Sequence, residues 1–171
     1  IMVTPGGKQA LFEVFQTLID GDDGSHPSSG TESRSGDEVV LLDPAWVSYE
    51  AMTKIAGGSL NRVDTAQYDF RLEGALGDLR GAVTDDTELL VLNSPGNPHG
   101  AVYSEVALQG VRDIAVNNDV MVISDEIYDR ILYDGTSFTS LGTLEGMRDR
   151  TITLNGFSKS YAMTGWRLGY F

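Results

Sequence analysis

Apolar runs and segments of helical periodicity alternate along the chain. Between residues 8 and 19 the apolar side chains recur at i, i+4 and i+8, which is typical of a helix with one face on a core. Residues 120–123 are apolar at every position, as expected of a strand that is covered on both faces. The same criteria predict helices at residues 8–19, 46–56, 71–79 and 104–117, the last capped by Ser104. They predict strands at residues 38–42, 59–63, 88–92, 120–123 and 150–154.

Strands that alternate with helices indicate an α/β fold, in which a mostly parallel sheet carries helices on both faces. Residues 20–37 interrupt this pattern, because they contain no aliphatic side chain and no Phe, Tyr or Trp, and are rich in Gly, Ser and Asp. We expect a flexible polar loop there, inserted into the fold. Ile1 and Phe171 each fall within an apparent strand, so we expect the chain to be a piece of a larger protein.

Composition narrows the classes of function. The formal net charge of −13 comes from 25 acidic and 12 basic residues, and a field of this sign repels nucleic-acid phosphates. The chain has no cysteine and two histidines, which excludes disulfides and argues against a metal site. It has no apolar run of about 18 residues and no secretory signal at its start, so we expect no membrane span and a cytoplasmic location. The acidic surface suits either a high-salt habitat or an ordinary acidic protein.

Four polar clusters follow predicted strands, at the sheet edge where α/β proteins bind ligands. They span residues 4–8, 93–100, 124–128 and 155–169. The first is a glycine turn that leads into a helix; such turns bind phosphate through backbone N–H groups, but they are also common as plain structure. In the second, Asn97 can donate a hydrogen bond to a ligand oxygen or merely cap a turn, and we expect His99 at the turn surface.

The most informative residue is Lys159, one of three lysines, which lies in a turn of small residues after a predicted strand. Such a lysine can form a Schiff base with an aldehyde cofactor, and Arg167 can hold the cofactor's phosphate. Asp125 follows an apolar strand, where a carboxylate is costly unless it is paired, and a protonated ring nitrogen would pair with it. The structural alternatives are a surface lysine, an aspartate that pairs with an arginine or caps a helix, and a core position for Trp46.

Together these residues resemble the class I pyridoxal-phosphate aminotransferases of the aspartate-aminotransferase-like group, which have fold type I. The Gly-Phe-Ser-Lys segment at residues 156–159, with Gly165 and the Arg-Leu-Gly at residues 167–169, is similar to the family's lysine-site signature. The Asn-Pro-x-Gly turn at residues 97–100 and the Asp-Glu-x-Tyr segment at residues 125–128 are similar to two further motifs. The resemblance covers the chain apart from residues 20–37.

The resemblance implies the large domain of a transaminase that binds pyridoxal 5′-phosphate. Lys159 would form the Schiff base and move the substrate's α-proton, Asp125 would pair with the ring nitrogen, and Tyr128 would hydrogen-bond the phenolic oxygen. The implied cofactor-binding residues are Gly7, Lys8, Trp46, Asn97, Asp125, Tyr128, Ser158, Lys159 and Arg167. The implied substrates are an amino acid and a 2-oxo acid, held in part by Lys8, Trp46 and Asn97. Lys8 suggests a dicarboxylic amino acid, and the full enzyme is expected to be a homodimer.

The chain also departs from the family. Some relatives have a serine at the position of Gly156, so one phosphate contact is missing here. The family's N-terminal arm and its C-terminal small domain, which carries the arginine for the substrate α-carboxylate, have no counterpart, so residues 1–171 alone are expected to be poorly active. The alternatives are another enzyme of the superfamily such as a lyase or a synthase, a regulator that senses pyridoxal phosphate, and an inactive scaffold.

Overall fold

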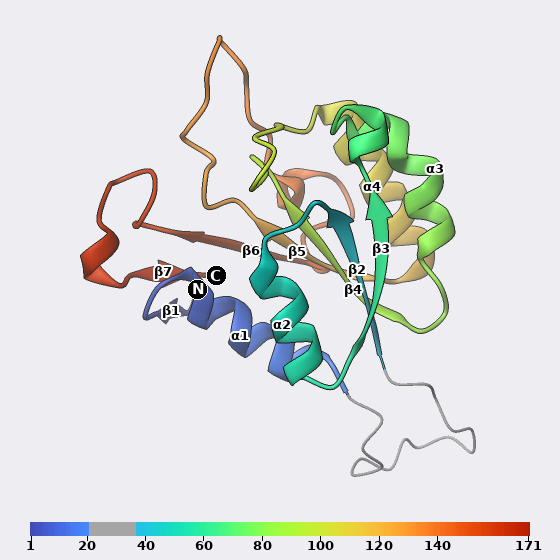
Figure 1. Ribbon diagram of the computed structural model, residues 1–171, viewed down its shortest axis with the longest axis horizontal. Helices are drawn as coiled ribbons and strands as arrows, with labels where there is room; N and C mark the ends of the chain where they lie inside the picture. The colour runs from blue at the N-terminus through green and yellow to red at the C-terminus, as the bar shows by residue number, and fades with distance from the viewer. Residues whose placement is uncertain (21–36) are drawn as a thin grey trace.

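A computed structural model describes residues 1–20 and 37–171 of the chain (Figure 1). The loop predicted at residues 20–37 therefore lies almost wholly outside the described residues. Its two ends lie side by side: the N–H of Asp20 donates to Asp37 Oδ2 at 2.8 Å, and the N–H of Asp37 donates to the Asp20 carbonyl at 3.2 Å. Asp20 and Asp37 are therefore hydrogen-bonded neighbours in the fold.

Within the described residues, seven strands form one sheet in the order β1-β7-β6-β5-β4-β2-β3. The strands are β1 (Val3–Thr4), β2 (Glu38–Asp43), β3 (Ser59–Asp64), β4 (Thr87–Asn93), β5 (Met121–Asp125), β6 (Thr151–Gly156) and β7 (Gly169–Tyr170). Strands β2 to β6 pair in parallel, while β7 is antiparallel to both of its neighbours. The predicted mostly parallel sheet is confirmed, and each of the five predicted strands occurs with ends within two residues of the prediction.

Helices cover both faces of the sheet (Figure 1). Helices α1 (Gly7–Leu18) and α2 (Val47–Ile55) lie on one face, and α3 (Leu72–Ala82) and α4 (Glu105–Asn118) lie on the other. Short 3₁₀ turns occur at η1 (Ala66–Tyr68), η2 (Leu141–Thr143) and η3 (Thr164–Trp166). The predicted cap of α4 is confirmed, because Ser104 Oγ accepts a hydrogen bond from the N–H of Ala107 at 3.2 Å. None of the helices in the described ranges is long and apolar enough to span a membrane.

The central strands supply side chains to two cores. In β2, Val39 and Leu41 pack with α1 and α2, whereas Val40 and Leu42 pack with α3 and α4. All four residues are buried. This alternation with a period of two explains why β2 has no polar residue between its first and last positions, since each face lies beneath a layer of helices.

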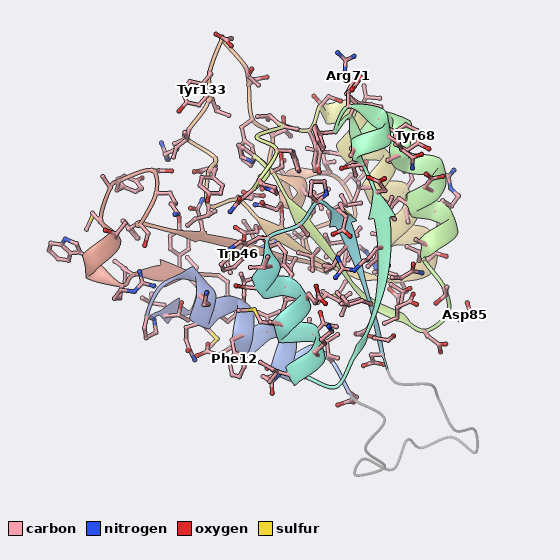
Figure 2. The ribbon with its side chains drawn as sticks, viewed as in Figure 1. Phe12, Trp46, Tyr68, Arg71, Asp85 and Tyr133 are labelled. Atoms are coloured by element: carbon pink, nitrogen blue, oxygen red, sulfur yellow. The ribbon has the colours of Figure 1, made fainter. Side chains whose placement is uncertain are left out.

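The carboxyl ends of β2, β4, β5 and β6 meet at one edge of the sheet, because these strands are parallel. Strand β2 lies between β3 and β4. The chain therefore goes from β2 to β3 on one side, and then crosses β2 to reach β4 on the other side. Such a reversal separates the loops at neighbouring strand ends and leaves a crevice between them. Away from this crevice, the loop after β5 projects from the body of the molecule and carries the exposed Tyr133 (Figure 2).

Candidate active site

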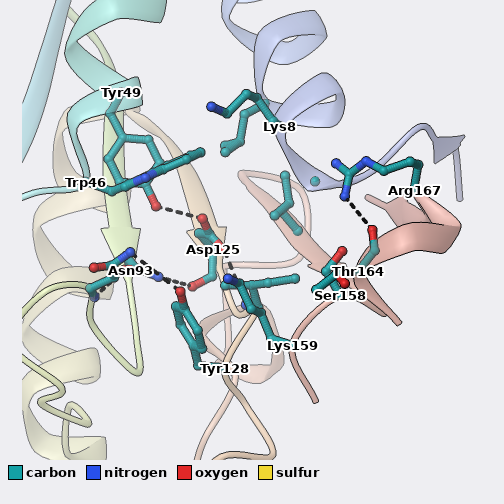
Figure 3. A pocket seen from close by; sticks show the side chains of 15 residues that line it. Lys8, Trp46, Tyr49, Asn93, Asp125, Tyr128, Ser158, Lys159, Thr164 and Arg167 are labelled. Atoms are coloured by element: carbon teal, nitrogen blue, oxygen red, sulfur yellow. Dashed lines mark hydrogen bonds between the residues drawn. The ribbon is translucent and has the colours of Figure 1, made fainter. Parts of the chain in front are cut away.

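A cavity of about 250 Å³ opens at the carboxyl edge of the sheet (Figure 3). This volume lies just below the range of about 300–1,000 Å³ that is common for small-molecule sites. It is lined by Gly7, Lys8, Leu11, Trp46, Tyr49, Asn93, Asn97, Asp125, Ile127, Tyr128, Leu154, Ser158, Lys159, Thr164 and Arg167. All nine residues that the resemblance implies for the cofactor are in this set. The fold therefore brings together segments that are up to 160 residues apart, from Gly7 to Arg167.

Asp125 ends β5 and is 4% exposed. The Tyr49 hydroxyl donates to its Oδ2 at 2.6 Å, and the N–H of Ile127 donates to its Oδ1 at 3.2 Å. Neither donor carries a charge, and burial raises the pKa of the carboxyl to about 6. No arginine pairs with Asp125 among the ion pairs of the described residues, and a turn rather than a helix follows it. Among the described residues Asp125 therefore has neither an arginine partner nor a helix to cap.

Tyr49 is the partner of Asp125 that sequence reasoning misses. It is 2% exposed, and burial, followed by the charge of Asp125, raises the pKa of its hydroxyl well above the ordinary value, so the hydroxyl remains a donor. Its ring meets the Trp46 ring edge to face at 5.4 Å, with an angle of 85° between the planes. The signal in the sequence is the spacing of three between Trp46 and Tyr49, which places both on one face of a helix. A tyrosine in that position also suits an ordinary core.

The turn after β4 closes the wall of the cavity beside Asp125. The N–H of Asn97 donates to Asn93 Oδ1 at 2.8 Å, and Asn93 Nδ2 donates to the Asp125 carbonyl at 3.0 Å. Asn93 thus caps the turn and joins it to β5. Asn97 keeps its side chain for the cavity, where Nδ2 lies 3.5 Å from the Tyr128 hydroxyl. The two groups can hydrogen-bond the same ligand oxygen.

Lys159 lies in the turn after β6. The residue is exposed and lines the cavity, and its Nζ lies 5.8 Å from the centroid of the Tyr128 ring. It takes part in none of the ion pairs of the described residues. Figure 3 shows the side chain near Tyr128 and Asp125, across the cavity from Lys8. An amine that is not held by a carboxylate is available to react with a carbonyl group.

At the other end of the cavity, Arg167 faces the turn before α1. The Gly6 backbone has a φ of +86°, and a Cβ built there would lie 2.3 Å from Arg167 Nη2. Helix α1 begins at Gly7 with no side-chain cap, so its first N–H groups face outward. Arg167 Nη1 donates to the Thr164 carbonyl at 3.0 Å, and the Ser158 side chain lines the same cavity. A helix N-terminus beside a guanidinium is a favourable place for phosphate.

Lys8 and Trp46 form the remaining wall. Lys8 Nζ lies 4.9 Å from the centroid of the Trp46 ring, within the range of a cation–π contact. Trp46 is half-buried and belongs to the edge of the core on the α1 side, so its ring both packs and lines the cavity. The core alternative and the binding prediction for Trp46 are therefore compatible.

Two neighbouring positions do not enter the cavity. Glu126 points away from it, as the alternation of a strand predicts, and accepts hydrogen bonds from Ser124 Oγ at 2.9 Å and Ser140 Oγ at 2.7 Å. Gly156 does not line it either. A Cβ at Gly156 would lie 3.0 Å from Ile127 Cδ1, so even a small side chain would require the neighbour to move.

Comparison with known proteins gives curated relatives of which this chain covers only a part. Identity is 44% over 172 residues with a probable aspartate/prephenate aminotransferase of Thermus aquaticus, and the match covers 99% of this chain and 39% of the relative. Identity is 45% over 171 residues with an aspartate aminotransferase of Pyrococcus abyssi, with 99% of this chain and 40% of the relative covered. The chain therefore spans about two fifths of the length of these curated relatives.

Solved structures share the fold. An aspartate aminotransferase of Thermus thermophilus, in a double mutant, superposes with a TM-score of 0.82 at 40% identity, over 98% of this chain and 39% of that one. An aromatic aminotransferase from Pyrococcus horikoshii superposes with a TM-score of 0.83 at 42% identity, over 98% of this chain and 41% of that one. Residues 28–171 match the family described as aminotransferase class I and II. Because that match takes in most of the chain, the protein belongs to the class I and II aminotransferases.

Proposed function

We propose that the protein binds pyridoxal 5′-phosphate and transfers amino groups between an amino acid and a 2-oxo acid. One observation carries the proposal: a single cavity is lined by the amine of Lys159, which no ion pair of the described residues holds, by the buried carboxylate of Asp125 and by the start of α1 beside Arg167. These three groups match the aldehyde, the ring nitrogen and the phosphate of the cofactor. Membership of the aminotransferase family supports the same reaction.

The carboxylate fits the ring nitrogen for an electrostatic reason. Asp125 is buried with neutral donors only, so ionising it is costly in the protein without a ligand. A protonated ring nitrogen would stabilise the ionised form and offset the burial. Tyr49 and Ile127 each hold one oxygen of the carboxylate, so they fix its orientation before a ligand arrives. The site is therefore preorganised for a cationic ring.

The remaining wall residues would bind and orient the other parts of the cofactor. The N–H groups at Gly7 and Lys8, with Ser158 and Arg167, would hold the phosphate. Trp46 would stack on the ring, and Asn97 and Tyr128 would donate to the phenolic oxygen. When bound, the cofactor would supply a conjugated ring that withdraws electrons from the bonds at the substrate's α-carbon.

Lys159 would transfer the α-proton of the substrate. Its amine would take the proton from the α-carbon of the substrate and return it in the reverse direction, as a general base and acid. The amine is suited to this work because no carboxylate in the described residues holds it in an ion pair. Tyr128, whose ring centroid lies 5.8 Å from Nζ, would limit the directions from which a substrate approaches.

We propose a dicarboxylic amino acid as the amino donor. Lys8 places a cation on the wall opposite Lys159, where it would attract a distal carboxylate, and Trp46 and Asn97 would contact the rest of the substrate. Relatives named for aspartate support this choice. An aromatic donor is the second candidate, because a 39% identical relative from Thermococcus litoralis is named an aromatic-amino-acid aminotransferase. Addition of aspartate or of phenylalanine to the loaded protein separates the two.

The test uses the full-length protein, pyridoxal phosphate and borohydride. We expect reduction to fix the label on Lys159, as located by peptide mapping, and aspartate to shift the visible absorbance before reduction. Lys159→Ala should abolish the label. Lys54→Ala is the matched control, because Lys54 pairs with Glu50 on the surface and should not affect labelling. A label on another lysine, or none, would contradict the proposal.

We also propose that residues 1–171 form the large cofactor-binding domain of the enzyme and that the active enzyme is a homodimer. The shares of 39% and 40% of the relatives' lengths support the first point, since they leave room for a further domain in such proteins. Light scattering of the full-length protein measures the second. A cytoplasmic location stays a prediction.

A further inference from the structure

His99 has a more specific environment than its place in a turn predicts. The sequence places it at the turn surface, yet it is half-buried, and burial lowers its pKa. Its ring stacks on Phe70 at a centroid distance of 5.1 Å with 6° between the planes, and it lies 6.2 Å from Tyr103. Phe70 adopts a φ of +59°, a conformation that is strained for a bulky residue. Phe70 therefore stacks on the imidazole of His99 with a strained backbone conformation.

The imidazole also fixes the turn that carries Asn97. The N–H of Ala101 donates to His99 Nδ1 at 3.1 Å, which requires this nitrogen to be unprotonated. The ring covers Gly96 so closely that a Cβ there would lie 2.0 Å from His99 Cε1. Asn97 lies between these contacts, with its Nδ2 3.5 Å from the Tyr128 hydroxyl. The ring therefore packs directly against the turn that carries Asn97.

A small space joins His99 to the back of the active site. It has a volume of about 10 Å³, near that of one water molecule. His99, Tyr49, Asn93 and Asn97 border it, and the last three also line the larger cavity. His99 thus lies behind the part of the cavity wall that Tyr49, Asn93 and Asn97 form.

We propose that His99 is a positioning residue, whose neutral imidazole clamps the turn so that Asn97 faces the cofactor, and that protonation of the ring releases the clamp. This rests on the proposed function, because Asn97 needs a cofactor to contact. Protonation puts a second N–H against that of Ala101, so two donors meet and the hydrogen bond is lost.

The groups that face His99 do not change their own charge in the pH range in which the ring would be protonated. Tyr103 is buried, which raises its pKa to about 12, and the hydroxyl of Tyr49 also titrates far above neutral, so both stay uncharged. Phe70 does not titrate, and the chain neighbours on its two sides, Asp69 and Arg71, carry opposite charges. Burial alone lowers the pKa of His99, so the clamp holds at neutral pH and is lost only as the pH falls below the ordinary range of histidine.

Two variants separate the hydrogen bond from the stacking. His99→Phe keeps a ring against Phe70 but lacks the acceptor, whereas His99→Asn offers an oxygen to the N–H two residues on and does not titrate. The dissociation constant for pyridoxal phosphate, measured by fluorescence of the full-length protein, is expected to rise about tenfold in His99→Phe at pH 8. His99→Asn should match the wild type at pH 8 and bind more tightly than the wild type at pH values below the ordinary range of histidine.

A double-mutant cycle with Asn97→Ala tests whether His99 acts through Asn97. In the Asn97→Ala protein, His99→Phe is expected to cause no further loss of affinity. The proposal is overturned if His99→Phe binds as tightly as the wild type, if its loss persists without Asn97, or if wild type and His99→Asn share one pH profile. If the wild type binds no pyridoxal phosphate, the proposed function itself fails and this inference fails with it. Should His99→Phe not fold, the pH profiles of His99→Asn and the wild type decide the matter.

Discussion

At Asp125, the carboxylate that the proposed cofactor needs lowers the stability of the cofactor-free protein. Its folded pKa of about 6 lies above the ordinary value of 3.8 for an aspartate, so the folded protein holds this proton more tightly than the unfolded chain. The stability that this proton gives is complete below the unfolded pKa and is lost as the pH rises from about 4 to above 6. A gap of this size amounts to roughly 3 kcal/mol at neutral pH. A protonated ring nitrogen that pairs with the ionised carboxylate would offset this loss of stability when the cofactor binds.

Asp125→Asn is therefore expected to stabilise the cofactor-free protein while it destroys function. The amide cannot ionise, and the Tyr49 hydroxyl can rotate to accept from its Nδ2. In urea unfolding at several pH values, the free energy of unfolding of the variant relative to the wild type should rise between pH 4 and pH 6. Above that range the difference should reach about 3 kcal/mol. Transamination by the full-length variant should fall at least about 100-fold, since the ring nitrogen loses its partner. A difference in stability that is the same at every pH would contradict the burial argument.

The residues of the site were predictable to the extent that they follow strands. Asp125 ends β5, and Asn97 and Lys159 lie within four residues after the ends of β4 and β6, so the rule that ligands gather at strand ends finds them without a structure. Tyr49 escapes that rule because it lies within α2, where a buried tyrosine is ordinary. His99 escapes it because its stacking partner Phe70 comes from a distant turn. Contacts between side chains of different elements could not be predicted from the sequence.

At the scale of elements, the anion end of the site depends on the close approach of glycines. A Cβ at Gly169 of β7 would lie 2.5 Å from the N of Gly7, and one at Gly6 would collide with Arg167. The N-terminus of α1, strand β7 and Arg167 can meet only because Gly6 and Gly169 carry no side chain. Periodicity predicted the helices and the parallel strands, but this antiparallel edge depends on contacts between the two ends of the chain.

Gly6→Ala tests this arrangement. The φ of +86° is unfavourable for alanine by about 1–2 kcal/mol, and the new methyl group would displace the guanidinium of Arg167. We expect lower stability in urea and at least tenfold weaker binding of pyridoxal phosphate. Gly77→Ala is the matched control, because Gly77 lies within α3 and a Cβ there meets nothing within 4 Å. It should stabilise the protein by about 0.5–1 kcal/mol without changing affinity. Normal binding by Gly6→Ala would contradict the proposed phosphate site.

At the scale of the whole molecule, surplus negative charge is the dominant feature. Acidic residues outnumber basic ones by 25 to 12, and the ion pairs of the described residues lie at the surface, where each contributes little. Arg62 joins two of these pairs, to Asp43 at 2.8 Å and to Glu50 at 2.6 Å, which ties β3 to the start of α2. Such pairs do not neutralise a net charge of −13, so repulsion between carboxylates opposes folding.

Salt should therefore raise the melting temperature, and the range over which it does so separates the two interpretations of the acidic surface. Simple screening is nearly complete at 1 M KCl, where the Debye length is about 3 Å, so an ordinary acidic protein should reach a plateau there. We expect a rise of several degrees up to that point, and only a surface adapted to high salt should continue to gain steeply toward 3 M. Chloride bound at the N-terminus of α1 near Arg167 would also stabilise the protein, so the titration is repeated with pyridoxal phosphate bound. A rise that persists in the loaded protein comes from the surface, whereas a flat curve in both forms would show that the surplus charge does not limit stability.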